Sequence, residues 1–259
     1  MPAPDQSSVP IAFDISHGIA RVKLQRPPLN VLDLETLRRL NQALREADVS
    51  AARVIVLSSN LPRAFSAGVE IRDHVASRLQ SMLAEVRENA RLLLQTNAVT
   101  LAAIHGSTMG GGAELALLCD LVVAADNLTL AFPEIGLAAF PPIASALLPE
   151  RCPGPAAMRL LLGESIDART AEDLGLISTI VSADRLNDAA EELSNRIAGY
   201  SAVALYALIR STRGQRTPGI LQRLDAAIAT YQAIVGPSLD AQEGIDAFLE
   251  KRTPAWSHR

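Results

Sequence analysis

The sequence predicts an α/β protein with a helical C-terminal part, and three observations support this prediction. Apolar, strand-like runs alternate with runs of helical period in the first half of the chain, for example at residues 52–60 and 77–97. From residue 170 onward the pattern is mostly helical. Hydrophobic residues make up 49% of the 259 residues but aromatic ones only 3%, so we expect a core of Ala, Leu, Val and Ile side chains. This length fits one large domain, or one domain with a terminal appendage.

Turn and cap residues predict the N-terminal elements. Two short alternating runs flank residues 16–18, Ser-His-Gly, which is typical of a hairpin. Pro27 and Pro28 then end the strand pattern, because proline has no amide N–H to donate inside a sheet. Asp33 is the predicted N-cap of a helix over residues 34–48, where leucines recur at helical spacing.

The remaining elements follow from the same patterns. Residues 52–60 and 98–106 are nearly all apolar, as in strands buried inside a sheet. Residues 63–74 are expected to form a loop of small residues after the first of these strands. The other predicted elements are strands at residues 121–126 and 128–137, and helices at residues 77–97, 113–120, 184–200, 216–236 and 238–252.

Charge and cysteine usage disfavour several classes of function. The formal net charge of −4 does not favour a nucleic-acid or acidic-membrane partner. No apolar run reaches the ~20 residues of a membrane-spanning helix, and residues 1–8, an expected flexible tail, lack the pattern of a signal peptide. Cys119 and Cys152 lack metal-ligand spacing and the four histidines are scattered, so no metal site is expected. A reduced, cytoplasmic location is the simpler interpretation, although a disulfide stays open.

Three consecutive glycines, Gly110–Gly112, precede a helix-like run with an acid, Glu114, in its first turn. The N-terminus of a helix offers unpaired backbone N–H groups, and glycines let a ligand approach the main chain. The pattern therefore suits an anion or oxyanion site, while tight packing of the turn is the other interpretation. The P-loop pattern and the dinucleotide fingerprint are both missing around these glycines, so a nucleotide site is not favoured.

A second acid, Glu134, lies among apolar neighbours that include Phe132, Pro133 and Ile135. Such surroundings raise the pKa of a carboxyl group, which suits proton transfer near neutral pH. The small residues at 63–70 either expose a further N–H to a ligand or form an ordinary turn. Either acid alone favours a structural role, whereas two acids beside a possible oxyanion site indicate catalysis.

Five motifs carry a resemblance to a known family: RAFSAGVEIRDH, AAIHGSTMGGGAELALLCDLVVAAD, LAFPEIGL, ARTAEDLGLI and AFLEKRTPAW. In this order they resemble the enoyl-CoA hydratase/isomerase (crotonase) superfamily over residues 10–259. The resemblance implies a crotonase-like (ClpP/crotonase) spiral of ββα repeats over residues 9–195 and a helical trimerisation region over residues 196–259. It also implies trimers, often paired into hexamers, and an acyl-CoA thioester substrate whose CoA part makes a separate cofactor unnecessary.

The resemblance also implies the site residues. Family members hold the thioester oxygen with two backbone N–H groups, which correspond here to those of Val69 and Gly111. Family hydratases use two glutamates, which correspond to Glu114 for water activation and Glu134 for proton delivery to the α-carbon. The residues expected to contact substrate or CoA are Ser66, Ala67, Gly68, Ile71, Gly110, Phe140 and Pro141.

The stretch after the second acid narrows the expected substrate. Typical family hydratases have a glycine-rich turn there, whereas residues 137–154 read LAAFPPIASALLPERCPG. This stretch resembles the family's cyclohexa-1,5-diene-1-carbonyl-CoA hydratases, in which Phe140, Pro141 and Pro142 would help shape a compact apolar pocket. Capping of a helix is the other interpretation of these three residues. The alternative functions are ordinary 2-enoyl-CoA hydration, enoyl isomerisation, and a non-catalytic trimer that binds CoA esters or RNA.

Overall fold

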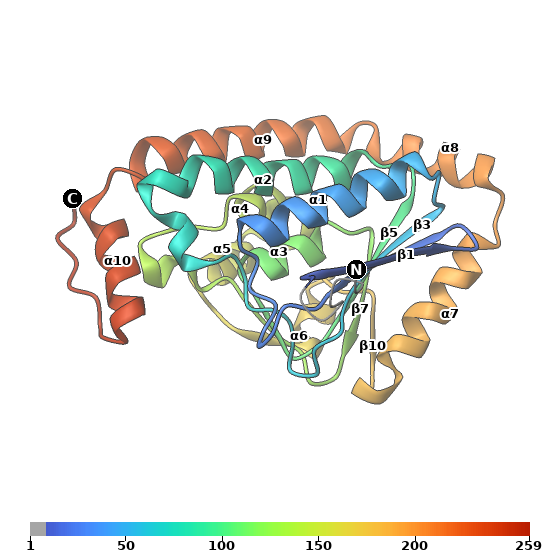
Figure 1. Ribbon diagram of the computed structural model, residues 1–259, viewed down its shortest axis with the longest axis horizontal. Helices are drawn as coiled ribbons and strands as arrows, with labels where there is room; N and C mark the ends of the chain where they lie inside the picture. The colour runs from blue at the N-terminus through green and yellow to red at the C-terminus, as the bar shows by residue number, and fades with distance from the viewer. Residues whose placement is uncertain (1–8) are drawn as a thin grey trace, which may run out of the picture.

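The computed structural model describes residues 9–259 (Figure 1), and the predicted flexible tail at residues 1–8 lies outside them. Within this described part the strands form one sheet of six and one of four. The first sheet has the order β1-β2-β3-β5-β7-β10, and the second has the order β4-β6-β8-β9. The strands are β1 Ile11–Ser16, β2 Ile19–Leu24, β3 Val54–Ser59, β4 Ala64–Ser66, β5 Val99–Ile104, β6 Ser107–Met109, β7 Leu121–Ala125, β8 Thr129–Ala131, β9 Ile166–Asp167 and β10 Thr179–Val181.

The predicted N-terminal hairpin is confirmed, because β1 and β2 pair antiparallel on either side of His17 and Gly18. Both turn residues have positive φ, 53° and 79°, which suits a two-residue connection between twisted strands. From β2 onward, neighbouring strands of the first sheet run parallel. The strands β3 and β5 are buried along almost their whole length, as their apolar sequences predict.

A repeating unit organises the middle of the chain. Three times, a strand of the first sheet leads into a short strand of the second sheet and then into a helix. The sequence-based prediction of a spiral of ββα repeats is therefore confirmed. The three units are β3-β4-α2, β5-β6-α3 and β7-β8-α4, with α2 Ala76–Gln95, α3 Gly111–Leu117 and α4 Pro142–Arg151.

Helices cover both faces of the first sheet. Along β3, Ile55 and Leu57 join a core cluster with α1 and α2, whereas Val54 and Val56 join a second cluster with α7 and α8. In Figure 1, α1, α2 and α9 lie side by side as one layer, and α10 lies at the end of the molecule away from α7 and α8. The other helices are α1 Leu34–Val49, α5 Gly154–Leu161, α6 Ala168–Asp173, α7 Leu186–Ala198, α8 Ala202–Arg213, α9 Arg216–Thr230 and α10 Leu239–Glu250.

Some ends of helices and strands lie where the sequence predicts them, and others do not. Asp33 caps α1 as predicted, since its Oδ1 accepts from the N–H of Thr36 at 2.9 Å. The strand predicted over residues 128–137 is wrong after Ala131, because Pro133 lacks an N–H and begins a 3₁₀ helix, Pro133–Leu137. The mostly helical pattern after residue 170 also contains a strand, β10, which forms by pairing with β7.

The expected loop at residues 63–74 contains regular structure as well. It begins with β4 and ends in a 3₁₀ helix, Ile71–His74, capped by Glu70. The strand β4 pairs with β6. This pairing places the turn that follows β4 against the glycine-rich turn that follows β6. The two loops singled out in the sequence are therefore neighbours in space.

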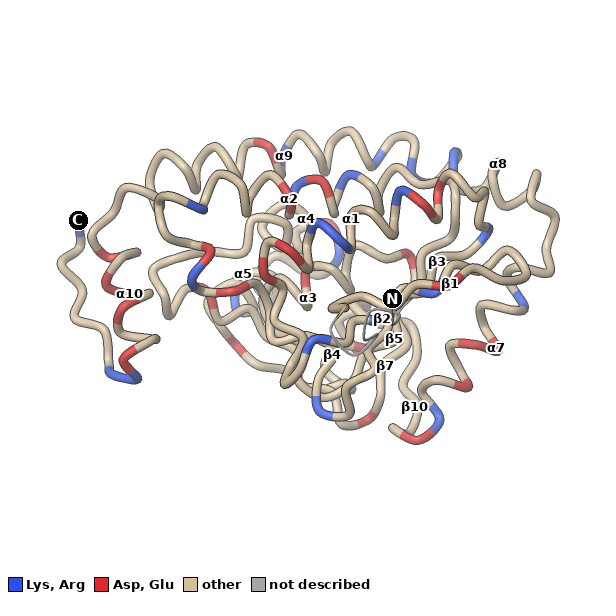
Figure 2. The backbone as a smooth tube through the Cα atoms, in the orientation of Figure 1, with Lys and Arg blue, Asp and Glu red and all other residues tan. Residues whose placement is uncertain are grey.

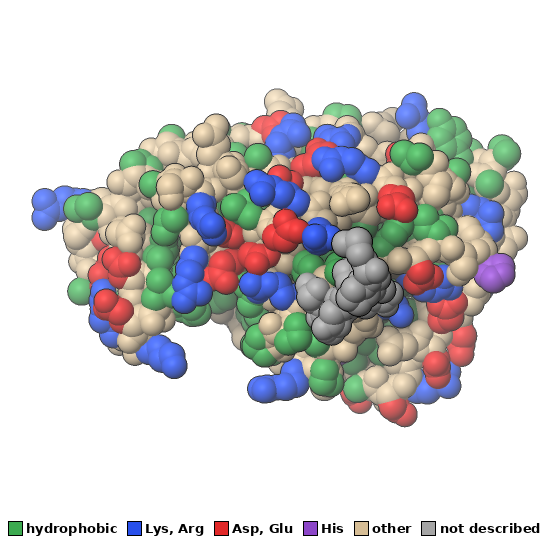
Figure 3. All heavy atoms as spheres, viewed as in Figure 1, with side chains coloured by type: hydrophobic (Ala, Val, Ile, Leu, Met, Phe, Trp, Pro, Cys, Tyr) green, Lys and Arg blue, Asp and Glu red, His purple; other side chains and the backbone are tan. Residues whose placement is uncertain are grey.

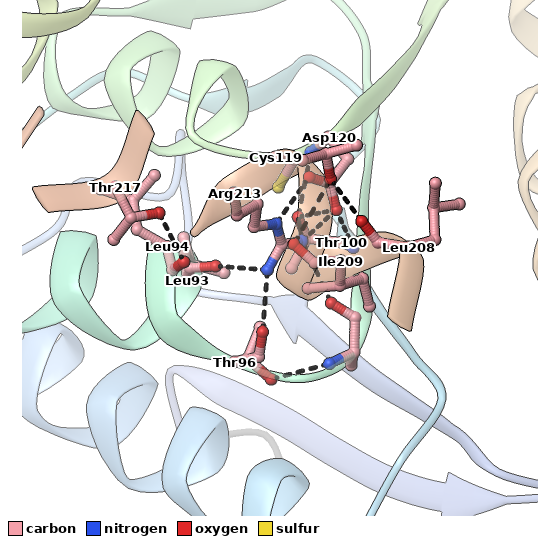
Figure 4. Close-up of polar contacts among 12 residues, drawn as sticks. Leu93, Leu94, Thr96, Thr100, Cys119, Asp120, Leu208, Ile209, Arg213 and Thr217 are labelled. Atoms are coloured by element: carbon pink, nitrogen blue, oxygen red, sulfur yellow. Dashed lines mark hydrogen bonds and ion pairs between the residues drawn. The ribbon is translucent and has the colours of Figure 1, made fainter. Parts of the chain in front are cut away.

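Arg213, at the end of α8, joins the C-terminal helices to the core (Figure 4). Its Nε donates to Oδ1 of Asp120 at 2.8 Å, and its Nη1 donates to the carbonyl oxygen of Thr96 at 2.9 Å. Its remaining acceptors are the carbonyl oxygens of Leu93 and Ala98, the hydroxyl of Thr100 and the second carboxylate oxygen of Asp120. One side chain thus holds the ends of α2 and α3 together with the starts of β5 and β7.

The structure also bears on three features that were considered in the sequence: membrane-spanning helices, metal-binding clusters and the two cysteines. None of the helices in residues 9–259 is both long and apolar enough to cross a membrane. The same residues contain no cluster of three or more His, Cys, Asp or Glu side chains that could hold a metal ion. Cys119 and Cys152 are both free and buried.

Candidate active site

A cavity of about 840 Å³, including its open mouth, lies where the two predicted loops meet the C-terminal helices. The turn after β4 and the turn after β6 form one wall. The 3₁₀ helix Pro133–Leu137 and the start of α4 form a second wall. Side chains from α2, from α10 and from the end of α9 close the remaining side.

The first turn presents the main chain of Val69 to the cavity. The N–H of Leu32 donates to the carbonyl oxygen of Gly68 at 2.8 Å, and the N–H of Glu70 donates to that of Leu32 at 3.1 Å. The N–H of Val69 lies between these two bonds and has no acceptor among residues 9–259. It is therefore available to a ligand in the cavity.

The second turn presents the N–H of Gly111, the first residue of α3. This N–H has no acceptor within the described chain either, as expected at the start of a helix. A β-carbon on Gly111 would lie 2.6 Å from Cγ2 and 3.5 Å from the amide nitrogen of Val69. Only glycine permits this close approach, which brings the two free N–H groups together on one wall.

Glu114 lies in the first turn of α3 and is only 3% exposed. Its Oε1 accepts from the N–H of Ala144 at 2.8 Å, in the first turn of α4. Because Pro142 opens α4 without an N–H, the next amides are the ones that face the carboxylate. The orientation of Glu114 is thus fixed by a second helix N-terminus.

Glu134 lies in the 3₁₀ helix on the opposite wall, and the structure brings it to the same cavity as Glu114. Its Oε1 packs against Gly110, where a β-carbon would lie 2.5 Å away. Its Oε2 is buried and has no hydrogen-bond partner within residues 9–259. An orphaned carboxylate oxygen in a cavity is unusual in a folded protein and indicates a place for a ligand.

Both carboxyl groups are disposed to hold protons near neutral pH. Burial raises the pKa of Glu114, although the amides of Ala144 and Ile143 oppose the rise. Burial also raises the pKa of Glu134, and the nearby charge of Glu114 raises it further. Glu114, with its two amide partners, therefore ionises before Glu134.

Most of the predicted contact residues line the cavity, and one does not. Ala67, Gly68, Ile71, Gly110, Phe140 and Pro141 all do so. Ser66 is fully buried in β4 instead, where its hydroxyl donates to the carbonyl oxygen of Asn30 at 2.7 Å and accepts from the N–H of Gly68 at 3.1 Å. Ser66 therefore supports the first turn from beneath and does not face a ligand.

Several residues that line the cavity are not predicted by any pattern in the sequence. His74, Met82 and Tyr231 belong to elements that reach the cavity only through tertiary packing. The ring of Tyr231 packs on that of Phe140, with centroids 5.2 Å apart and planes at 43°. His74 is held by a contact of 3.0 Å between its Nδ1 and the carbonyl oxygen of Glu70, and burial lowers its pKa.

Comparisons with known proteins agree with this geometry. The model of the enoyl-CoA hydratase/isomerase family matches residues 14–259. The chain is 35% identical over 244 residues to cyclohexa-1,5-dienecarbonyl-CoA hydratase of Thauera aromatica, which covers 93% of this chain and 94% of that protein. It is 33% identical over 233 residues to 2,3-dehydroadipyl-CoA hydratase of Escherichia coli (strain K12), with 89% of each chain covered. A crystal structure of an enoyl-CoA hydratase from Mycobacterium avium subsp. paratuberculosis K-10 shares the fold, with a TM-score of 0.86 at 23% identity over 96% of this chain and 98% of that one.

The match extends over nearly all of the described residues and includes both walls of the cavity. The two relatives are named as hydratases, which are hydro-lyases. The motifs, the fold and the arrangement of two free amides with two buried acids thus lead to one family. The chain belongs to the enoyl-CoA hydratase/isomerase family, the crotonase superfamily of enzymes.

Proposed function

We propose that this enzyme adds water to a conjugated enoyl-CoA thioester, and that its substrate is cyclohexa-1,5-diene-1-carbonyl-CoA. The observation that carries the proposal is the convergence of four groups on one cavity: the free N–H groups of Val69 and Gly111, and the carboxyl groups of Glu114 and Glu134. The CoA part belongs to the substrate, so the proposed reaction needs no further cofactor.

The two amides supply the electrophilic half of the reaction. A thioester oxygen between the N–H groups of Val69 and Gly111 would become more negative as water attacks the conjugated double bond. Fixed donors stabilise this enolate-like charge because they need no reorganisation, and each such donor typically contributes ~3 kcal/mol to lowering the barrier. The positive end of the α3 dipole points at the same place.

The two acids supply the proton transfers. Glu114, which ionises first, accepts a proton from water as the water oxygen bonds to the β-carbon of the acyl group. Glu134, which keeps its proton longer, delivers a proton to carbon as the enolate collapses. Water is thereby added in full, and the two carboxyl groups exchange their protonation states.

The acyl wall favours a compact ring over a long chain. Phe140 and Pro141 line the cavity beside Tyr231, so that two packed aromatic rings and a proline ring face the acyl site. Flat, rigid walls suit a flat cyclic diene. The relative from Thauera aromatica is named for its action on a thioester of this kind.

Open-chain enoyl-CoA hydration and enoyl isomerisation are the closest alternatives, and the Escherichia coli relative is named for an open-chain thioester. Turnover assays with the cyclic dienoyl-CoA and with crotonyl-CoA separate these functions. We expect kcat/KM to be higher for the cyclic substrate. Strong turnover of crotonyl-CoA without turnover of the cyclic diene would overturn the proposed substrate while leaving hydration in place.

A binding role without catalysis is less well supported. The helix α2 has no lysine, and its three arginines are in ion pairs: Arg78 with Asp73, Arg87 with Asp225, and Arg91 with Glu88. Figure 2 shows both acidic and basic positions along α1 and α2, and Figure 3 shows both signs intermingled on the face viewed. This face therefore lacks the continuous basic surface that RNA binding needs. The non-catalytic alternative would be favoured if Glu114→Gln and Glu134→Gln left all measured behaviour of the protein unchanged.

We also propose that the enzyme works as a homotrimer or as a hexamer of two trimers, with the helices after residue 196 at the interface. Large apolar side chains on the outer face of α8 support an interface there, since Val203 is 78% and Leu208 57% exposed. Light scattering after size-exclusion chromatography tests the assembly. A monomer at micromolar concentration would contradict it.

A further inference from the structure

Tyr231 has a position in the cavity that the motif analysis does not explain. It follows α9 directly and begins a π-helical turn, Tyr231–Val235, a distortion that is frequent at functional sites. Its side chain lines the cavity, although only 3% of the residue is exposed. Packing on Phe140 fixes the plane of its ring.

The hydroxyl of Tyr231 makes no hydrogen bond with any part of the chain that the structure describes. Unlike Glu134 Oε2, the Tyr231 oxygen is not fully enclosed by the described chain, so it is open to a hydrogen-bond partner in the cavity. Burial raises the pKa of Tyr231, and the charges of Glu134 and, more weakly, Glu114 raise it further, so the phenol stays protonated. The hydroxyl is therefore a protonated donor in the cavity that the two acids also line.

Glu134 presents the complementary group. Its Oε2 is buried and unpartnered, and it lines the same cavity. Tyr231 and Glu134 do not bond to each other, so each needs a partner that is not a group of the described chain. A hydroxyl group satisfies both, because it accepts one hydrogen bond and donates another.

We infer that Tyr231 and Glu134 together hold the hydroxyl that hydration places on the β-carbon of the acyl group, with Tyr231 as donor and Glu134 Oε2 as acceptor. This inference rests on the proposed function, since it concerns the oxygen that the reaction adds. Tyr231 is then a residue that recognises hydroxyacyl thioesters. Tyr231 and Glu134 also orient the attacking water, because the water oxygen occupies the place of the hydroxyl before the bond to carbon forms.

Two matched ligands test the inference without turnover. Pivaloyl-CoA and 3-hydroxy-2,2-dimethylpropanoyl-CoA differ by one hydroxyl on the β-carbon, and neither has an α-hydrogen, so neither can be dehydrated. Titration calorimetry of both ligands with the parent enzyme and with Tyr231→Phe gives a thermodynamic cycle. We expect the preference for the hydroxylated ligand to fall by about tenfold in the variant, as for one lost hydrogen bond, with pivaloyl-CoA affinity unchanged.

Tyr206→Phe is the matched control, because Tyr206 is 48% exposed on α8, an element that does not line the cavity. It should leave both affinities as they are. Equal losses for both ligands in Tyr231→Phe, or no loss for either, would overturn the inference and leave Tyr231 as a wall residue. Because the hydroxyl has no partner within residues 9–259, Tyr231→Phe should melt at the parent's temperature or above it. A clear drop in melting temperature would reveal a structural role for the hydroxyl and would equally overturn the inference.

The same titrations separate this inference from the proposed function. If the parent binds both ligands but hydrates no enoyl-CoA, the proposed function fails while the hydroxyl preference still decides the role of Tyr231. If the parent binds neither ligand, the CoA-ester function fails and the inference fails with it.

Discussion

The carboxylate of Glu134 rests directly on the α-carbon of Gly110. A β-carbon at Gly110 would lie 2.5 Å from Oε1 and 3.3 Å from Cδ of Glu134. Gly110 also has φ of +49°, in the left-handed region, while its N–H donates to the carbonyl oxygen of Ala131 at 2.9 Å. The first glycine of the triplet therefore places the second acid, although the two are 24 positions apart in the chain.

Gly110→Ala should consequently act as a mutation of Glu134. The new methyl group would displace the Glu134 carboxylate, so we expect kcat to fall by about a hundredfold, as for a lost general acid. Affinity for pivaloyl-CoA should change much less than kcat. Gly136→Ala is the control, since a β-carbon at Gly136 meets nothing within 4 Å. If the two variants have the same kcat, the contact between Gly110 and Glu134 has no role in catalysis.

The pH dependence of hydration should reflect the order in which the two acids ionise. Activity requires Glu114 ionised and Glu134 protonated, so kcat should rise as Glu114 loses its proton and fall as Glu134 does. Because both pKa values are raised, both limbs of this bell should lie above the pH range of ordinary glutamates, about 4.3. Glu134→Gln should lower kcat by about a hundredfold and remove the alkaline limb. A profile of unchanged shape in the variant would show that another group is the acid.

The burial that prepares Glu114 for catalysis should also lower stability at alkaline pH. Its pKa is higher in the folded than in the unfolded protein, so the folded state binds more protons between the two values. The free energy of unfolding therefore falls as pH rises from about 4.3 through the raised pKa, and stays lower above it.

Glu114→Gln should remove this pH-dependent loss. We expect it to be more stable than the parent by about 1–2 kcal/mol at alkaline pH, with the difference shrinking toward acidic pH. Urea unfolding at several pH values measures it. Glu46→Gln, on the exposed face of α1, is the matched control. A difference that grows toward acidic pH would mean that Glu114 is stabilised as a carboxylate instead.

The part of the site whose residues are neighbours in the chain could be predicted from the sequence. The contacts between residues that are distant in the chain could not. Gly111 and Glu114 are neighbours in a strand–turn–helix unit, so glycine chemistry and helix polarity suffice to connect them. The apolar neighbours of Glu134 predict a raised pKa, but they indicate catalysis only together with Glu114 and the possible oxyanion site. That its carboxylate lies on Gly110 follows only from the pairing of β6 with β8.

Tyr231 shows why the rest escaped prediction. In the sequence it is one more apolar position in a helical repeat, and nothing local marks the π-helical turn that it begins. Its role depends on α9 packing against α2 and α4, which brings it to Phe140.

Ser66 illustrates the opposite case. A small hydroxyl residue in the predicted ligand loop faces inward, because all of β4 is buried and the Ser66 hydroxyl bonds to the carbonyl oxygen of Asn30 and the N–H of Gly68.

The network around Arg213 makes the attachment of the C-terminal helices testable (Figure 4). The Arg213 side chain is only 12% exposed, and its planar guanidinium donates to acceptors on α2, on β5 and in the turn before β7.

A lysine at position 213 would keep the charge but could not reach all of these acceptors at once. Arg213→Lys should therefore lower the free energy of unfolding by roughly 3 kcal/mol, because the carboxylate of Asp120 and several carbonyl groups lose their donor. Arg210→Lys, one turn earlier on α8 and exposed, should be nearly neutral in the same chemical denaturation experiment. Since α9, which leads directly into Tyr231, begins three residues after Arg213, we further expect Arg213→Lys to weaken binding of 3-hydroxy-2,2-dimethylpropanoyl-CoA. Equal stability of the two lysine variants would show that packing of α9 alone holds the C-terminal helices in place.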